Sequence, residues 1–362
     1  MRIALALLLG FVFFAACEAE PEIADGNCLE ITLTGTQGGP PAVGGLAGAG
    51  TLVRYGSVAS NCSEVVMQFD AGRGTTQRLS QIGLSPSDLH AIFLTHVHSD
   101  HTEGLAGLLQ YRWHFLGGPV DVVCSADAIQ KQPGPARTLS CSGLVAHTAD
   151  AMLQSGEIAQ RIAENTKRIA GGPAALVNLQ TVSLPLPDKA GSIVWQSGDV
   201  SVSAIGTVHI AGSLAYRVDT PEGSVVIAGD AGNSVPAPPR ESSTSEAVEL
   251  LASAADVLVQ STMHSIFAPG SGSRFPPIAY YRQSNVVDIG AMADRAGVEH
   301  LMLTHLIPAL DAPSHGPYVV PGGPVTGEDY ERAAREGGFD GNVHVGVDLM
   351  TLRMPVRPEY RE

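Results

Sequence analysis

Four side chains that can bind a metal ion lie within six consecutive residues: His96, His98, Asp100 and His101. They follow the apolar stretch 91–94 directly. Alternating His96 and His98 can face one ion from a turn, while Asp100 and His101, at the start of a helix, can face a second. Imidazole with carboxylate suits zinc and also iron or manganese. Because such groups rarely gather at a strand end by chance, the run predicts a metal centre.

Strand and helix patterns alternate around this run. Short apolar, β-branched runs predict strands at 29–35, 51–55, 65–70, 91–95, 120–124, 200–208, 214–218, 224–228, 257–260, 300–304 and 343–352. Helical periodicity predicts helices at 75–82, 101–113, 245–255, 285–296 and 327–336. Early hairpins followed by alternating strand and helix indicate the α/β class, as an αββα sandwich of two mixed β-sheets flanked by helices.

Residues 143–198 interrupt this rhythm. A polar helix around 149–170 is followed by a segment punctuated by glycine and proline that ends at Gly198. The stretch is interpreted as an insertion around 143–198. It could cover the site as a lid, or it could be a surface excursion without a catalytic role.

The N-terminus has the pattern of an export signal. Arg2 precedes the apolar run 3–14, and Ala15-Ala16-Cys17 forms a small-residue exit. The predicted organisation is a signal peptide over 1–16, a tether over 17–28 and one domain over 29–362. Cys17 resembles the lipidated cysteine of bacterial lipoproteins, although Phe14 is not the usual aliphatic residue. The predicted location is therefore exported and periplasmic, with a lipid anchor at Cys17 as the contact with a membrane; simple cleavage and a buried N-terminal helix are the alternatives.

The other four cysteines, Cys28, Cys62, Cys124 and Cys141, allow three pairings. Cys28–Cys62 and Cys124–Cys141 are favoured, because each would join segments expected to be neighbours. None has the CxxC spacing, which argues against a cysteine metal site.

The formal net charge is −15, and no run rich in lysine or arginine is present. Nucleic-acid binders usually present a basic face to the phosphates. Composition thus predicts no nucleic-acid partner, although it does not argue against a small anionic substrate.

The run from His96 to His101 resembles the HxHxDH signature of the metallo-β-lactamase superfamily. The resemblance extends over roughly 29–354, because later motifs follow in order. It implies the metallo-β-lactamase fold. It also implies that Asp70, in Phe69-Asp70-Ala71-Gly72, supports a ligand histidine and is not itself a ligand.

The same resemblance assigns the remaining ligands. His209 follows Gly206-Thr207-Val208, and Asp230 and His305 each end an apolar strand. Two divalent ions are implied, with zinc expected first and manganese or iron as alternatives. The first ion would take His96, His98, His209 and Asp230, and the second Asp100, His101, Asp230 and His305.

Within the superfamily, 70–74 and the Ala215-Tyr216-Arg217 segment are similar to the branch of ribonuclease Z and metal-dependent arylsulfatases. Ribonuclease Z members carry a glutamate after the bridging aspartate, where this chain reads Val259-Gln260-Ser261-Thr262. This departure, with the charge and the export signal, argues against processing of transfer RNA.

The predicted function is therefore an exported dinuclear hydrolase of small anionic esters, an aryl sulfate or a phosphodiester, that uses a metal-bound hydroxide. A lactone or β-lactam hydrolase and a non-catalytic metal-binding lipoprotein are the alternatives, and a homodimer is left open.

Asp100 is predicted to orient the nucleophile. His264 is predicted to protonate the leaving group, with capping of the next segment as its alternative. His315 could line the pocket, although exposure to solvent is preferred, and Arg217 could meet an anion or form an ion pair.

Overall fold

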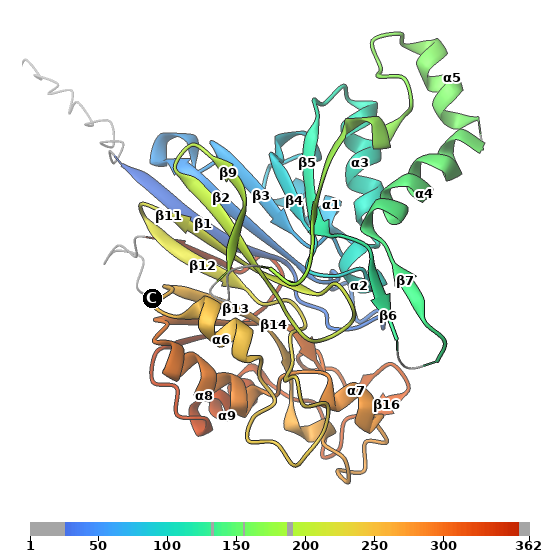
Figure 1. The fold of residues 1–362 in the computed structure, drawn as a ribbon. Helices are drawn as coiled ribbons and strands as arrows, with labels where there is room; N and C mark the ends of the chain where they lie inside the picture. The colour runs from blue at the N-terminus through green and yellow to red at the C-terminus, as the bar shows by residue number, and fades with distance from the viewer. Residues whose placement is uncertain (1–25, 132–133, 155, 187–190, 355–362) are drawn as a thin grey trace, which may run out of the picture.

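Two β-sheets pack face to face with helices on their outer sides in the computed structural model, which describes residues 26–354 except 132–133, 155 and 187–190 (Figure 1). The predicted αββα sandwich is confirmed. The predicted signal peptide, the cysteine at its exit and most of the tether lie outside the described residues. None of the helices in the described part of the chain has the length and apolar character needed to cross a membrane.

The first sheet has the order β18-β1-β2-β3-β4-β5-β8. Its strands are β1 (Asn27–Gly35), β2 (Gly50–Ser57), β3 (Val65–Phe69), β4 (Ala91–Phe93), β5 (Val120–Ser125), β8 (Val177–Val182) and β18 (Thr351–Met354). The second sheet has the order β17-β14-β13-β12-β11-β10-β9. Its strands are β9 (Ser192–Ser197), β10 (Val200–Gly206), β11 (Leu214–Thr220), β12 (Gly223–Ile227), β13 (Val257–Met263), β14 (His300–Ile307) and β17 (Asn342–Val345).

The two sheets share one layout. In each, three antiparallel pairings are followed by three parallel ones, and the change occurs at β3 in the first sheet and at β12 in the second. Two small hairpins, β6 (Ala128–Gln130) with β7 (Arg137–Leu139) and β15 (Ser314–His315) with β16 (Tyr318–Val319), lie outside the sheets. The candidate ligands lie at or just after the ends of β4, β10, β12 and β14, which brings both halves of the chain to one edge of the sandwich.

The helices are α1 (Thr75–Gln81), α2 (Ser99–Thr102), α3 (Leu105–His114), α4 (Cys141–Gln154), α5 (Glu157–Glu164), α6 (Glu246–Ala252), α7 (Pro277–Tyr281), α8 (Val286–Ala296) and α9 (Gly327–Glu336). Side chains that accept a backbone N–H begin three of them: Ser245 caps α6, Asn285 caps α8 and Thr326 caps α9. Helix α3 packs on the outer face of the first sheet, while α6, α8 and α9 cover the outer face of the second.

Apolar side chains fill the space between the sheets. Phe69 and Phe93 from the first sheet stack with ring centroids 4.7 Å apart, and Tyr216 from the second sheet packs against Phe93 at 5.4 Å. All three are buried. Fully burying one large apolar side chain contributes about 1.5–3 kcal/mol, so this core fixes the two sheets, and the ligand loops at their edge, relative to each other.

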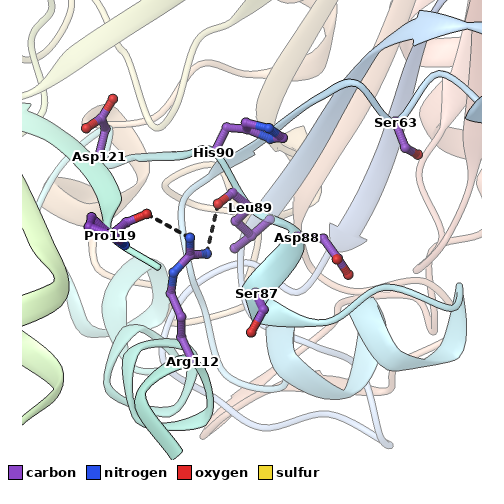
Figure 2. Close-up of a pocket in the computed structure, with 8 residues that line it drawn as sticks. All are labelled: Ser63, Ser87, Asp88, Leu89, His90, Arg112, Pro119 and Asp121. Atoms are coloured by element: carbon purple, nitrogen blue, oxygen red, sulfur yellow. Dashed lines mark hydrogen bonds between the residues drawn. The ribbon is translucent and has the colours of Figure 1, made fainter. Parts of the chain in front are cut away.

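Helix α3 is tied to the loops that enter β4 and β5 by the buried guanidinium of Arg112 (Figure 2). Its Nη1 donates to the carbonyls of Pro86 and Leu89 at 2.7 and 2.8 Å, and its Nη2 donates to Pro119 O at 2.8 Å. Arg112 lines a surface cavity of about 430 Å³. Because its donors are used by backbone carbonyls, the side chain is a structural clamp.

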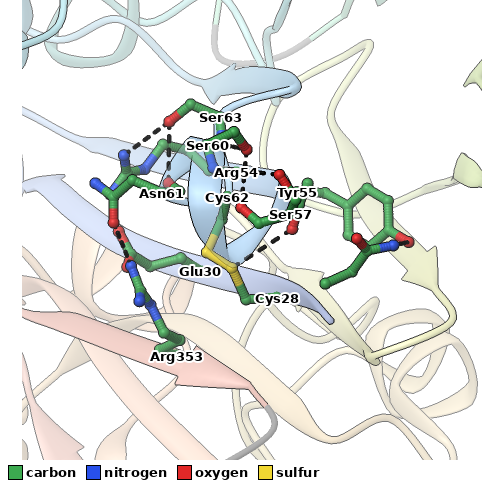
Figure 3. The surroundings of a disulfide bond; sticks show 12 residues. Cys28, Glu30, Arg54, Tyr55, Ser57, Ser60, Asn61, Cys62, Ser63 and Arg353 are labelled. Carbon is green, nitrogen blue, oxygen red and sulfur yellow. Dashed lines mark hydrogen bonds and ion pairs between the residues drawn. A yellow bond between two sulfur atoms is a disulfide. The ribbon is translucent and has the colours of Figure 1, made fainter. Parts of the chain in front are cut away.

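Both predicted disulfides are confirmed. Cys28–Cys62 links β1 to the turn after the 3-10 helix Val58–Ser60, beside the ion pair of Glu30 with Arg54 (Figure 3). Cys124–Cys141 links β5 to the start of α4. Disulfides of this kind persist in oxidising compartments.

Three predicted elements differ from the structure. The strand expected over 343–352 is two strands, β17 and β18, which belong to different sheets. The helix expected over 101–113 is divided into α2 and α3. Segment 143–198 is not a uniform excursion: its α4 and α5 project from the body, whereas β8 and β9 complete the edges of the two sheets. Its role as a lid stays a prediction.

Candidate metal centre

The loop after β4 carries the His96–His101 run, and Asp70 at the end of β3 holds this loop in place. Asp70 Oδ1 accepts from the N–H of Thr95 at 2.8 Å. Its Oδ2 lies 2.8 Å from both Thr95 Oγ1 and His101 Nδ1. Asp70 has a left-handed backbone (φ 56°), which aspartate tolerates better than most residues. These contacts are the supporting role that the sequence predicts for Asp70.

The structure brings all seven predicted metal ligands together. Three overlapping groups each place their ligand atoms within 4.8 Å of one another: His96 with His98 and His209, His96 with His101 and Asp230, and Asp100 with His101 and His305.

Asp230 stands between the two halves of this cluster. Its Oδ1 lies 3.4 Å from His101 Nε2, and its Oδ2 lies 3.4 Å from His305 Nε2 and 3.6 Å from His209 Nε2. Among the described residues, the buried atoms His101 Nε2 and Asp230 Oδ1 make no hydrogen bond. Buried polar atoms are normally satisfied. Five imidazoles and two carboxylates arranged in this way fit divalent metal ions, and Asp230 would be shared by the ligands on its two sides.

His305 reaches the cluster through an irregularity in β14. The pairing of β13 with β14 shifts between Ser261 and Thr262, so that Ser261 pairs with Thr304 and Thr262 pairs with Leu306. His305 is the extra residue of this bulge and has a φ of 47°. A bulge bends a strand and redirects a side chain. Here it accompanies the turn of His305 toward Asp100, whose Oδ2 lies 3.1 Å from His305 Nε2.

Polar groups that the sequence analysis did not identify brace the cluster. Ser261 Oγ lies 3.0 Å from His305 Nδ1, and the N–H of Gly39 donates to His305 Nε2 at 3.1 Å. The amide of Gln283 donates to Asp230 Oδ2 at 3.2 Å. These residues lie in a strand interior or in loops and have no spacing signal that would single them out.

Burial keeps several ligand imidazoles neutral. It lowers the pKa of His96 well below its ordinary value and the pKa of His209 to about 4. Burial alone would raise the pKa of Asp100, but the hydrogen bond to His305 and the charge of His101 bring it to about 2. Neutral imidazole and ionised carboxylate are the forms that bind metal ions, so His96, His209 and Asp100 are held in ligand form. His101 differs: burial alone would lower its pKa, but the charges of Asp230 and Asp70 raise it well above its ordinary value.

A cavity of about 260 Å³ opens onto the cluster. Its lining includes the ligands His98, Asp100, His209, Asp230 and His305, together with Gly39, Pro40, Ser99, Met263, Phe275, Ala279, Arg282, Gln283, Ile307 and His315. The protein therefore presents a candidate metal centre to a space of small-molecule size.

His264 is the predicted site residue that the structure does not bring to the cavity. Its Nδ1 accepts from Ile266 N at 3.1 Å and so caps the 3-10 helix Ser265–Phe267. Its ring packs on Tyr330, with centroids 5.0 Å apart. This arrangement matches the capping alternative, because His264 follows β13 on the side away from the ligands.

The structure also places His315 and Arg217, for which the sequence left two roles open. His315 was expected to be exposed to solvent, but only 4% of its surface is accessible, and it lines the cavity. The prediction was wrong because β15 and β16 fold the glycine- and proline-rich loop over the site. Arg217 pairs with Asp219 at 2.9 Å and donates to two carbonyls at the end of α6, which is its ion-pair alternative.

Known proteins of one kind match almost the whole chain. Ribonuclease Z of Mycobacterium marinum is 30% identical over 334 residues, which covers 91% of this chain and 100% of that protein. Ribonuclease Z of Mycobacterium avium is 32% identical over 334 residues, with 90% and 98% covered. The profile of a protein family described as Anti-Pycsar protein Apyc1 matches residues 58–131.

Solved structures show the same fold. Human tRNase Z, short form, superposes with a TM-score of 0.57 at 16% identity and covers 90% of this chain and 100% of its own. The metallo-β-lactamase fold protein YhfI of Bacillus subtilis has a TM-score of 0.55 at 16% identity, with 90% and 99% covered.

The relatives overturn two predictions. The expected hydrolase of small anionic esters, and the expected absence of a nucleic-acid partner, were wrong, because relatives spanning nine tenths of the chain are named as ribonucleases. The net charge misled because it is summed over the whole chain, whereas a substrate meets the charges of one cavity. The missing glutamate of the 259–262 segment is a real departure: Gln260 occupies that stretch, fully buried.

The ligand set, the fold and these relatives together show that the chain belongs to the ribonuclease Z family of metal-dependent hydrolases, within the metallo-β-lactamase superfamily.

Proposed function

We propose that this protein is a metal-dependent phosphodiesterase whose substrate is RNA. The observation that carries the proposal is the gathering of seven candidate ligands, Asp230 among them, next to an open cavity, in a chain whose relatives are named ribonuclease Z. Two divalent ions, zinc first and manganese or iron as alternatives, fit these donors. When bound, they would supply Lewis acidity for the charge that develops on a phosphoryl group and for the activation of water.

The protein's own residues have distinct tasks in this proposal. His96, His98, Asp100, His101, His209, Asp230 and His305 hold the ions. Asp100, ionised and facing the cavity, also accepts a hydrogen bond from the attacking water and so orients it. Ser261 and Gln283 fix the directions of His305 and Asp230. His264 has no part in the reaction, because it lies outside the lining of the cavity.

The test is cleavage of RNA by the purified, zinc-loaded protein. Substrates are a transfer-RNA transcript with extra 3′ nucleotides, a single-stranded RNA and a DNA of the same sequence. We expect cleavage of RNA by the wild type and a loss of at least about a hundredfold in kcat for Asp100→Asn. Asp219→Asn, at a partly exposed carboxylate outside the cavity, serves as the matched control. Metal content and circular dichroism show whether Asp100→Asn remains loaded and folded. An RNA left intact by the wild type, with two metal ions bound, would refute the proposal.

We also propose that the protein is exported and anchored at Cys17. The support is the signal-like sequence of residues 1–17 and the presence of two disulfides in the folded domain. The full-length chain, expressed in a bacterium, should appear in the membrane fraction and carry a lipid detectable by mass spectrometry. Cys17→Ser should shift it to a soluble fraction; an unmodified wild type in the cytoplasm would contradict both parts of this proposal.

A further inference from the structure

Arg282 is the single lysine or arginine among the described residues that line the metal cavity. It follows α7 and is exposed to solvent. Its guanidinium forms no hydrogen bond or ion pair with the described residues, although the protein carries an excess of carboxylates, 36 against 21 lysines and arginines. The cavity therefore holds an unpaired positive charge together with Asp100 and Asp230, although the protein as a whole is acidic.

The backbone that carries Arg282 is rigidly attached to the metal-ligand loop. A Cβ at Gly232, two residues after Asp230, would lie 2.6 Å from the carbonyl oxygen of Arg282, so glycine permits this close approach. The side chain of Ser284 donates to Ala231 O at 2.7 Å. Together with the bond from Gln283 to Asp230, these contacts fix the 282–284 segment against the loop that supplies Asp230.

A second set of contacts holds the same segment from the other side. Arg240 donates to the carbonyl of Tyr281 at 3.1 Å, and Met263 N donates to Ser284 O at 3.0 Å. The Arg282 backbone is thus held at a defined position relative to the metal ligands, while its side chain stays free to meet a ligand. Such preorganisation reduces the entropy lost on binding.

The arginines elsewhere in the fold show what a structural guanidinium looks like. Arg112 also lines a cavity, but its donors are taken by backbone carbonyls (Figure 2). Arg217 is committed to Asp219 and to two carbonyls. Arg282 differs from both, because its donors make no hydrogen bond with the described residues and its side chain lines the metal cavity.

We propose that Arg282 binds a non-bridging oxygen of the substrate phosphate beside the metal cluster. This inference rests on the proposed phosphodiesterase function. A guanidinium offers planar, paired donors that match a phosphate, and removal of such a charged donor weakens binding by about tenfold or more. In this proposal Arg282 is a substrate-binding residue and not a metal ligand.

Binding of inorganic phosphate to the metal-loaded protein, measured by titration calorimetry, tests the assignment without turnover. Arg282→Gln should raise the dissociation constant about tenfold, and Arg282→Lys should recover part of the loss because it keeps the charge. Arg332→Gln, an exposed arginine on α9 outside the cavity, is the matched control and should bind like the wild type. Equal phosphate binding by Arg282→Gln and wild type would overturn the assignment, as would a wild type that does not bind phosphate at all.

Kinetics with RNA give a second, separate readout. Arg282→Gln should raise KM about tenfold and leave kcat within about twofold, because the contact is made in the bound ground state as well as the transition state. Its log affinity should also depend less on log salt, by about 0.7 in slope for one lost phosphate contact with single-stranded RNA. A wild type that binds phosphate through Arg282 but leaves RNA intact would refute the RNA substrate alone. An unchanged KM in Arg282→Gln would refute the role of Arg282 alone.

Discussion

Asp70 Oδ2 lies 2.8 Å from His101 Nδ1, and this contact joins the end of one strand to the helix that follows the next strand. The bond leaves Nε2 of the same ring facing Asp230 at 3.4 Å. It thereby fixes both the direction of the ring and the nitrogen that is offered to a metal ion. A carboxylate behind a ligand histidine also makes the imidazole a better donor.

Asp70→Asn should weaken metal binding by about 10–100-fold, because the amide cannot supply the charge that supports His101. Zinc affinity measured by competition with a chelating dye checks this. Asp219→Asn, at a partly exposed carboxylate outside the cavity, is the control and should bind zinc like the wild type. Unchanged affinity in a folded Asp70→Asn protein would show that the contact does not tune the site.

Asp348→Asn should destabilise the fold by about 2–3 kcal/mol. Asp348 Oδ2 accepts from Arg78 Nη2 at 2.7 Å and from Ala47 N at 2.8 Å, while its Oδ1 accepts from Thr36 N at 2.9 Å. The carboxylate thus anchors both ends of the loop that carries Gly39 to the cavity. Urea unfolding of the Asp348→Asn and Arg78→Gln variants and of the double variant measures the coupling. Strictly additive losses would mean that the two side chains do not act together.

Removing either disulfide should lower stability by about 3 kcal/mol, through the gain in freedom of the unfolded chain. The loop closed by Cys28–Cys62 spans 34 residues and that closed by Cys124–Cys141 spans 17. Replacement of both cysteines by alanine should therefore cost slightly more for the first pair. Urea unfolding of the two double variants checks the order. Equal stability with and without a reducing agent in the wild type would contradict the prediction.

Stability should fall as the pH decreases through the ordinary histidine range of about 6.5, and His344 should contribute to the loss. Burial, and then the charge of His300, lowers the pKa of His344 in the folded protein. The unfolded chain therefore binds more protons there, which favours unfolding at low pH. His344→Gln should lose less stability between about pH 7.5 and about pH 5 than the wild type. The exposed His147→Gln is the control, and an unchanged pH slope in His344→Gln would contradict the prediction.

Most of the fold followed from the sequence because its signals are local. Apolar runs with turn residues between them located the strands, and helical periodicity located the helices. The segment 343–352 shows the limit. Its alternation is continuous in the sequence, but Asp348 turns the chain to anchor Thr36 and Arg78, and the two halves join different sheets. That contact spans about 300 residues and leaves no local pattern.

The residues of the candidate site also divide into those with a local sequence signal and those placed by contacts between distant segments. The ligands were found because they follow strands and because their order resembles a known signature. His264 follows a strand too, yet the end of β13 directs it toward Tyr330. Gln283 and Arg282 escaped notice because the packing of the 282–284 segment against Gly232 places them at the cavity, and Ser261 because it meets His305 across two strands. No spacing in the sequence reveals these contacts.

The pairing of β1 with β18 has a consequence for the order in which the first sheet can form. Leu29 lies opposite Met354, and Glu30 holds Arg353 by a hydrogen bond of 2.9 Å. In the first sheet, the earliest described strand, β1, therefore lies next to the latest, β18, which forms the edge. More than three hundred residues separate the two paired strands, so the sheet lacks its last edge until the C-terminal segment is present. Until then one edge of β1 is unpaired, and a chaperone that binds extended chains can bind there.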